Sequence, residues 1–208
     1  MLLGIALLSL LIWVYLLTLR GGFWRSAERL TGSPAPRDSR LGDSWPAVTA
    51  VVPARNEAEV IAESLTSLLE QDYPGRLTVL LVDDHSDDDT VAQARAAAQR
   101  SRHPERFELL RAEALPPGWT GKLWALQQGS QAAGAAGDFL WFSDADIHQP
   151  PDMLRRLVAK AEAERRDLVS LMVALTCVSF WERLLIPPFI YFFQKLYPFA
   201  WVKDPKAK

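Results

Sequence analysis

Two aspartates, Asp144 and Asp146, follow directly after a short apolar run, Phe139 to Phe142, and are the side chains best placed for chemistry. Four apolar residues are too few for a helix and are typical of a strand buried on both faces. Ligands of α/β proteins bind beyond the carboxyl ends of parallel strands. Two carboxylates there can hold a hard divalent cation beside phosphate oxygens. A turn that uses Asp for its own hydrogen bonds is the alternative, and the simpler one for an isolated pair.

The surrounding sequence alternates between short apolar runs and helical patterns. Strands are predicted over residues 48–52, where Pro53 should end the strand, and over 77–82, 107–110, 139–142 and 168–175. Helices are predicted to start after Asn56, which forms a capping-box pattern with Glu59, and over 90–100, 121–136 and 150–161. This alternation predicts an α/β fold with a mostly parallel sheet and helices on both faces.

The predicted sheet collects further polar residues at the same edge. Three predicted strands are each followed by two charged residues. The pairs are Arg55 and Glu57, Asp83 and Asp84, and Asp144 and Asp146. Because parallel strands end at one edge, the three turns should converge on one crevice. Carboxylates there can bind ribose hydroxyls or base N–H groups while a metal neutralises phosphates, so a nucleotide site is predicted. The sequence contains neither G-x-G-x-x-G after the first strand nor a P-loop lysine followed by Ser or Thr, which disfavours those two nucleotide sites.

Composition narrows the class of protein. The chain has 208 residues, 49% hydrophobic and 23% charged, which suits one substantial core with an appendage. A net charge of −2 gives no basic field for nucleic-acid binding. The single cysteine, Cys177, and three scattered histidines have no metal-ligand spacing, so neither a disulfide framework nor a Cys/His metal site is predicted.

The N-terminal segment carries no charge from Leu2 to Leu19. A helix of that length reaches about 27 Å, close to the hydrocarbon thickness of a bilayer, which predicts a transmembrane anchor over residues 1–20. Five arginines and only two acidic residues follow up to residue 40, so the positive-inside rule places the rest of the chain in the cytoplasm. We expect a linker over residues 21–45, rich in Gly, Ser, Pro and charge, and a folded domain over residues 46–178.

Four blocks of sequence resemble the inverting glycosyltransferases of family 2, which have the Rossmann-like GT-A fold. The blocks are VVPARNE, LLVDDHSDDDT, WTGKLWALQQG and FLWFSDADI, and they occur in the family's order between Val48 and about Leu175. The resemblance implies a nucleoside-diphosphate sugar donor and a divalent cation, Mg²⁺ or Mn²⁺. By position, it implies a nucleotide pocket lined by Pro53, Ala54, Arg55 and Glu57, with Asp84 holding the base and Lys122 beside the donor.

The resemblance also assigns the two aspartates of the apolar strand. It implies that Asp144 faces the ribose or the metal and that Asp146 ligates the metal on the diphosphate. Lys122 lies at the N-terminal end of a predicted helix, which suits a diphosphate. A solvated surface lysine is the alternative interpretation of Lys122.

The last segment, residues 179–208, is aromatic and apolar but interrupted by charged residues and two prolines. Such a segment suits a membrane interface better than a membrane crossing, although a buried helical hairpin is almost as good an interpretation. Together with WTGKLWA, it looks more narrowly like the hopanoid-associated branch of the family. That likeness implies a lipid acceptor, and with the N-terminal anchor it predicts an enzyme on the cytoplasmic side of the inner membrane.

The family also uses a carboxylate to deprotonate the acceptor hydroxyl, in an acidic motif beyond the fifth strand. The sequence offers no good candidate for this base, since Glu182 is the only acid within the aromatic run. The chain is therefore expected to correspond to the donor-binding half of such an enzyme, as a fragment or a truncated product. Two alternatives remain, a nucleotidyltransferase and a catalytically inactive membrane scaffold that binds nucleotide.

Overall fold

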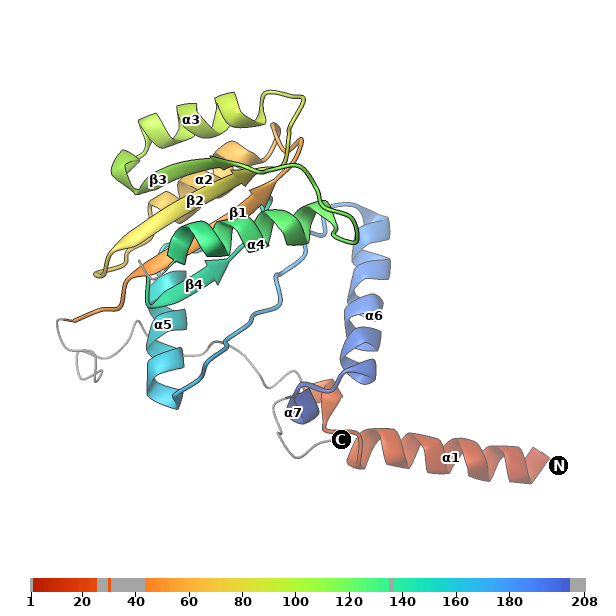
Figure 1. The fold of residues 1–208 in the computed structure, drawn as a ribbon. Helices are drawn as coiled ribbons and strands as arrows, with labels where there is room; N and C mark the ends of the chain where they lie inside the picture. The colour runs from red at the N-terminus through yellow and green to blue at the C-terminus, as the bar shows by residue number, and fades with distance from the viewer. Residues whose placement is uncertain (1, 26–29, 31–43, 135–136, 203–208) are drawn as a thin grey trace. The chain divides into compact units, whose positions relative to one another are not determined.

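The protein is described by a computed structural model that covers residues 2–25, 30, 44–134 and 137–202 (Figure 1). Most of the predicted linker, residues 31–43, lies outside this part of the chain. The chain divides into two compact units. The larger unit comprises Gly32–Ser170, and the smaller one comprises Met1–Thr31 together with Leu171–Lys208.

The larger unit contains a four-stranded sheet in the order β3-β2-β1-β4, and all of its strand pairs are parallel. The strands are β1 (Val48–Ala54), β2 (Leu77–Asp83), β3 (Phe107–Arg111) and β4 (Phe139–Phe142). The helices are α2 (Ile61–Leu69), α3 (Thr90–Arg100), α4 (Gly121–Ala133) and α5 (Met153–Glu164), with a short 3-10 turn, η2 (Pro104–Arg106), before β3. The predicted parallel α/β sheet is therefore confirmed.

Hydrophobic side chains cover both faces of this sheet. Because side chains alternate along a strand, Ala50 and Val52 of β1 face one layer while Val51 faces the other. Ala50 and Val52 belong to the core cluster that includes α2, α3 and α5, whereas Val51 packs in the cluster with Ala125 of α4. Figure 1 shows α2 and α3 on one face of the sheet and α4 on the other. The prediction of helices on both faces is confirmed.

Strand β1 continues through Pro53, which the sequence analysis expected to end it. The backbone of Val51 accepts a hydrogen bond from Ser143 N, on the β4 side, at 3.3 Å. Pro53 lies two residues further and faces the same side, and β4 ends opposite Val51. Pro53 has no N–H, but no residue of β4 lies opposite it, so the sheet loses no hydrogen bond there. On the other side of β1, Pro53 still pairs with Val82 of β2.

Strand β4 forms where the sequence predicts it, but it is not buried on both faces. It is an edge strand of the described sheet, and Trp141 is buried whereas Phe142 is 51% exposed. The strand predicted over residues 168–175 is wrong, because these residues have no regular secondary structure and Leu168 is 81% exposed. An apolar composition alone does not supply the neighbouring strand that a parallel strand needs.

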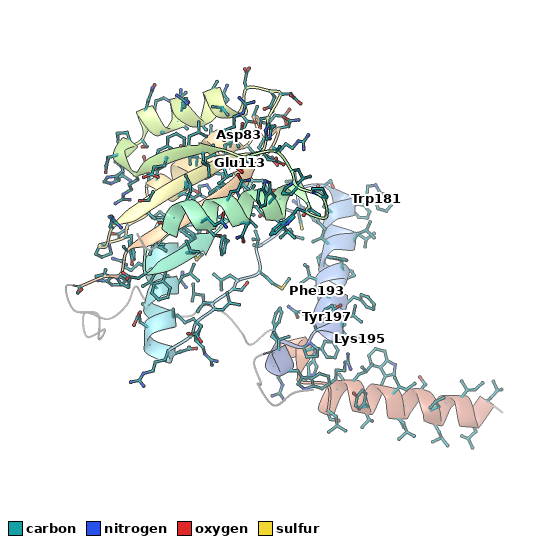
Figure 2. All side chains as sticks on the ribbon, viewed as in Figure 1. Asp83, Glu113, Trp181, Phe193, Lys195 and Tyr197 are labelled. Atoms are coloured by element: carbon teal, nitrogen blue, oxygen red, sulfur yellow. The ribbon has the colours of Figure 1, made fainter. Side chains whose placement is uncertain are left out.

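The smaller unit is helical. It contains α1 (Leu2–Thr18), η1 (Phe23–Arg25), α6 (Phe180–Leu196) and α7 (Phe199–Val202). Aromatic contacts recur in it, as between the rings of Phe193 on α6 and Tyr197 just after it, whose centroids are 5.2 Å apart (Figure 2). Helix α6 continues through Pro187 and Pro188.

Helix α6 begins with a capping box. Ser179 Oγ accepts a hydrogen bond from Glu182 N at 3.2 Å, and Glu182 Oε2 accepts one from Ser179 N at 2.7 Å. The N–H and hydroxyl of Ser179, followed by the N–H of Val178, hold the pKa of Glu182 below its ordinary value. A carboxylate held in this way is a weak base, which agrees with leaving Glu182 out of the catalytic residues.

The described residues contain no helix with both the length and the apolar content needed to cross a bilayer. Helix α1 has 17 residues, which span about 26 Å at 1.5 Å per residue. The transmembrane anchor predicted for residues 1–20 is therefore not supported by the structure.

Candidate functional site

A pocket of about 400 Å³ lies in the larger unit, where the turns after β1, β2 and β4 meet the first turn of α4. The eight residues to which the family resemblance assigns a role all line it. The full lining consists of Pro53, Ala54, Arg55, Glu57, Asp84, Gly121, Lys122, Ala125, Asp144, Ala145 and Asp146. The parallel sheet thus brings together side chains that are up to 93 positions apart, from Pro53 to Asp146.

Asp84 lines the pocket and is only 8% exposed. Its backbone N–H donates to the carbonyl of Ala54 at 2.9 Å, which fixes the residue just after β2. Its carboxylate lies between two basic side chains, with Oδ2 at 3.7 Å from Arg55 Nη1 and Oδ1 at 3.5 Å from His85 Nδ1. The basic side chains of Arg55 and His85 stabilise the charge of this buried carboxylate. Its oxygens can still accept hydrogen bonds from a molecule in the pocket.

The preceding residue, Asp83, which Figure 2 labels, has different contacts. Asp83 is buried and does not line the pocket. Its Oδ1 accepts a hydrogen bond from Ser86 N at 3.2 Å, and its carbonyl accepts one from Ala112 N at 2.9 Å. Only the second aspartate of the pair therefore lines the pocket, while the first shapes the turn.

The turns after β1 and β2 are joined by hydrogen bonds between residues 56–58 and 86–90, which we call the two-loop clamp. Asn56 has a positive φ of 56°. The prediction that it caps the following helix is wrong, because α2 begins at Ile61 and Val60 is the residue before it. Four bonds form the clamp: Asn56 N to Ser86 Oγ (3.1 Å), Asp87 N to Asn56 Oδ1 (2.9 Å), Glu57 N to Thr90 Oγ1 (2.8 Å) and Ala58 N to Asp88 Oδ2 (3.2 Å). The acidic run after β2 thus holds the neighbouring loop in place.

Asp144 and Asp146 also line the pocket, and both are exposed. Lys122 Nζ lies 2.6 Å from Asp144 Oδ1, and both side chains are more than half exposed. An ion pair that is so open to water contributes little to folding stability. The pair does place the positively charged side chain of Lys122 beside Asp144, in a pocket that Asp146 also lines.

The turn that carries these aspartates is tied to α2 by polar groups that the sequence analysis did not single out. Ser64 Oγ donates to the carbonyl of Ile147 at 2.9 Å, and Ser67 Oγ accepts from Gln149 N at 3.0 Å. Gln71 is 2% exposed, donates to the carbonyl of Pro150 at 2.8 Å and accepts from Leu154 N at 2.9 Å. The sequence signal is a polar residue every three to four positions along the same stretch as the buried leucines of α2.

The charges in the pocket suit a bound cation. The pKa of Glu57 is raised, first by burial and then by the negative charges of Asp146, Asp88 and Asp144, against the opposing effect of Lys122. Carboxylate oxygens are the ligands that Mg²⁺ prefers, and Mn²⁺ accepts them as well. Within the described part of the chain no three His, Cys, Asp or Glu side chains form a complete metal cluster. Asp144 and Asp146 therefore fit a cation whose remaining ligands come from a substrate or from water.

The raised pKa of Glu57 gives the first prediction, the effect of Glu57→Gln on stability. Because the pKa is higher in the folded state than in the unfolded state, ionised Glu57 opposes folding above the folded pKa. Glu57→Gln should therefore raise the melting temperature at pH 7 by about 1 to 3 °C, and this gain should vanish below pH 4, where the carboxyl is protonated in both states. Thermal unfolding monitored by circular dichroism at both pH values measures this change.

The matched control is Glu59→Gln, which neutralises an exposed glutamate two residues away that does not line the pocket. It should leave the melting temperature unchanged at both pH values. An equal gain from Glu57→Gln at pH 7 and at pH 3.5 would contradict the electrostatic explanation.

Residues 49–201 match the family model described as Glycosyl transferase family 2. The chain is 30% identical over 200 residues to a beta-monoglucosyldiacylglycerol synthase of Synechocystis, an alignment that covers 86% of this chain and 40% of the relative. It is 32% identical over 135 residues to an N-acetylglucosaminyltransferase of Rhizobium leguminosarum, covering 64% of this chain and 30% of the relative. The chain therefore spans less than half the length of these relatives.

A solved structure has a fold similar to that of this chain. The chain is similar to a mannosyltransferase from Pyrobaculum calidifontis in complex with GDP-Man and Mn²⁺, with a TM-score of 0.50 and 28% identity. The similarity covers 72% of this chain and 39% of the mannosyltransferase. The fold is therefore an α/β GT-A-like fold with a parallel sheet.

Proposed function

The chain belongs to glycosyl transferase family 2, and we propose that it forms the donor-binding part of an inverting glycosyltransferase. The proposed donor is a nucleoside-diphosphate sugar, the proposed acceptor is a lipid, and a divalent cation is required. The convergence of eight site residues from separate turns on one pocket carries this proposal.

The acidic residues of the pocket differ in exposure in a way that suits such a donor. Asp84 is sheltered and offers hydrogen-bond acceptors, which a base or a ribose hydroxyl can satisfy. Asp144 and Asp146 are exposed and, with Lys122, offer both a cation-binding pair and a cationic side chain. A volume of about 400 Å³ lies within the usual range for small-molecule sites.

The roles of the residues follow from these positions. Asp84 accepts hydrogen bonds from the base, while Pro53, Ala54 and Arg55 line the nucleotide pocket. Lys122 lies in the first turn of α4, where it can leave Asp144 and pair with the diphosphate beside the free N–H groups of the helix. Asp144 and Asp146 would hold the cation, which neutralises the diphosphate and makes it a better leaving group.

The lipid acceptor is proposed from two observations. The Synechocystis relative is named as a synthase of a glucosyldiacylglycerol. The smaller unit exposes Trp181, Tyr191 and Tyr197 on and just after α6, and such side chains favour a membrane interface. The hopanoid-associated branch and the cytoplasmic side of the inner membrane stay proposals that rest on the sequence alone.

Calorimetric titration of the whole chain with UDP and with GDP tests the proposed donor. Each nucleotide is titrated with Mn²⁺ and again with a chelator, and ATP serves as the comparison for a nucleotidyltransferase. We expect metal-dependent binding of one nucleoside diphosphate and weaker binding of ATP. Failure of folded protein to bind UDP or GDP would overturn the proposal, and tighter binding of ATP would favour a nucleotidyltransferase.

A further inference from the structure

Gly121, in the WTGK segment, lines the pocket but has no role in the proposal above. It is the first residue of α4, after Thr120, which has an extended backbone. A Cβ at this position would overlap Asp84 Oδ2, and the next nearest atoms would be Asp84 Cγ at 3.5 Å and Asp84 Oδ1 at 4.0 Å. All three of the nearest atoms thus belong to one carboxylate.

The backbone itself does not require glycine here. Gly121 lies in a helix and is not among the glycines with a positive φ. Alanine has a higher helix propensity than glycine, by about 1 kcal/mol in a helix interior. The lack of a side chain at residue 121 is therefore explained by the space that the Asp84 carboxylate occupies.

Asp84 cannot make room for a methyl group without losing its present position. Its backbone is fixed by the hydrogen bond from Asp84 N to the carbonyl of Ala54. Rotation of the carboxylate away from residue 121 would change the distances of its oxygens to Arg55 and His85. The orientation of the buried carboxylate is therefore coupled to the size of residue 121.

We propose that Gly121 is a positioning residue that holds the Asp84 carboxylate in the orientation needed to bind the nucleoside. This inference rests on the proposed nucleotide function and deepens it. It predicts that a methyl group at residue 121 damages recognition of the nucleoside and leaves the binding of the diphosphate intact.

The test compares Gly121→Ala with the unaltered whole chain by calorimetric titration with Mn²⁺. The ligands are the nucleoside diphosphate that the unaltered chain binds and inorganic pyrophosphate, which has no nucleoside. We expect Gly121→Ala to lose about 10-fold or more in affinity for the nucleotide, as for a misplaced charged hydrogen bond, and less than 2-fold for pyrophosphate. A further readout is the double variant with Asp84→Asn, in which the added methyl group should cause a smaller loss than it causes alone.

The control variant Gln127→Ala changes α4 away from the pocket lining and should bind both ligands normally. Unchanged nucleotide affinity in Gly121→Ala, or an equal loss for both ligands, would overturn the inference while leaving the function standing. Independent losses from Gly121→Ala and Asp84→Asn would also overturn it. Absence of nucleotide binding by the unaltered, folded chain would overturn the proposed function and this role together.

Discussion

Replacement of Asp146 by alanine should abolish metal-dependent nucleotide binding. Asp146 is exposed in the pocket and has no basic partner in the described structure, whereas Asp144 is paired with Lys122 at 2.6 Å. Asp146 is therefore the carboxylate most available to a cation. Loss of one of two protein ligands should weaken nucleotide binding by about 100-fold in Mn²⁺, which corresponds to about 2.7 kcal/mol.

The measurement for Asp146→Ala is calorimetric titration with nucleotide, in Mn²⁺ and again in chelator. The variant should bind in Mn²⁺ no better than the unaltered chain does in chelator. Asp167→Ala, which removes an exposed aspartate outside the pocket, controls for the change in net charge. If Asp146→Ala binds nucleotide with unchanged affinity in Mn²⁺, Asp146 does not ligate the metal.

Replacement of Asp84 by asparagine should weaken nucleotide binding both with and without metal. Asparagine has nearly the same size and still fits against Gly121, but it carries no charge and has an NH₂ group in place of one acceptor oxygen. A hydrogen bond to a charged group contributes about 1.5 to 3 kcal/mol, so the affinity should fall by about 10- to 100-fold. The same fold-change should appear in Mn²⁺ and in chelator.

The neighbouring variant Asp83→Asn is the matched control for Asp84→Asn. Its side-chain oxygen can still accept the hydrogen bond from Ser86 N, and the residue does not line the pocket. It should therefore bind nucleotide like the unaltered chain. A loss confined to the metal-dependent part of binding in Asp84→Asn would show that Asp84 serves the metal rather than the base.

Much of the larger unit could be predicted because its elements have local signals. Helix α3 and strand β4 have the predicted bounds, and β1, β2 and β3 differ only by one or two residues at their ends. The convergence of site residues could be predicted for a general reason, since parallel strands end at one edge of the sheet. Asp84, Lys122 and Asp146 come together in the pocket as a result.

The remaining features depend on contacts between distant residues, which no local pattern reveals. An aspartate pair does not show which member faces the ligand, and here Ser86 and Ala112 bind Asp83 and leave Asp84 to the pocket. Residues 168–175 have the composition of a strand, but the described structure gives them no regular secondary structure. The proposed role of Gly121 follows only from its close approach to the Asp84 carboxylate, a contact between residues far apart in the sequence.

The two-loop clamp has a thermodynamic consequence for ligand binding. Its four hydrogen bonds join residues 56–58 to residues 86–90, and through Glu57 they fix part of the pocket lining. Preorganised groups lose little conformational entropy on binding. Lys122, Asp144 and Asp146, by contrast, are exposed side chains of the lining, and a ligand that binds them has to order them. The entropic cost of binding a nucleotide should therefore arise mainly from its diphosphate, and a free nucleoside should bind with a smaller entropic penalty.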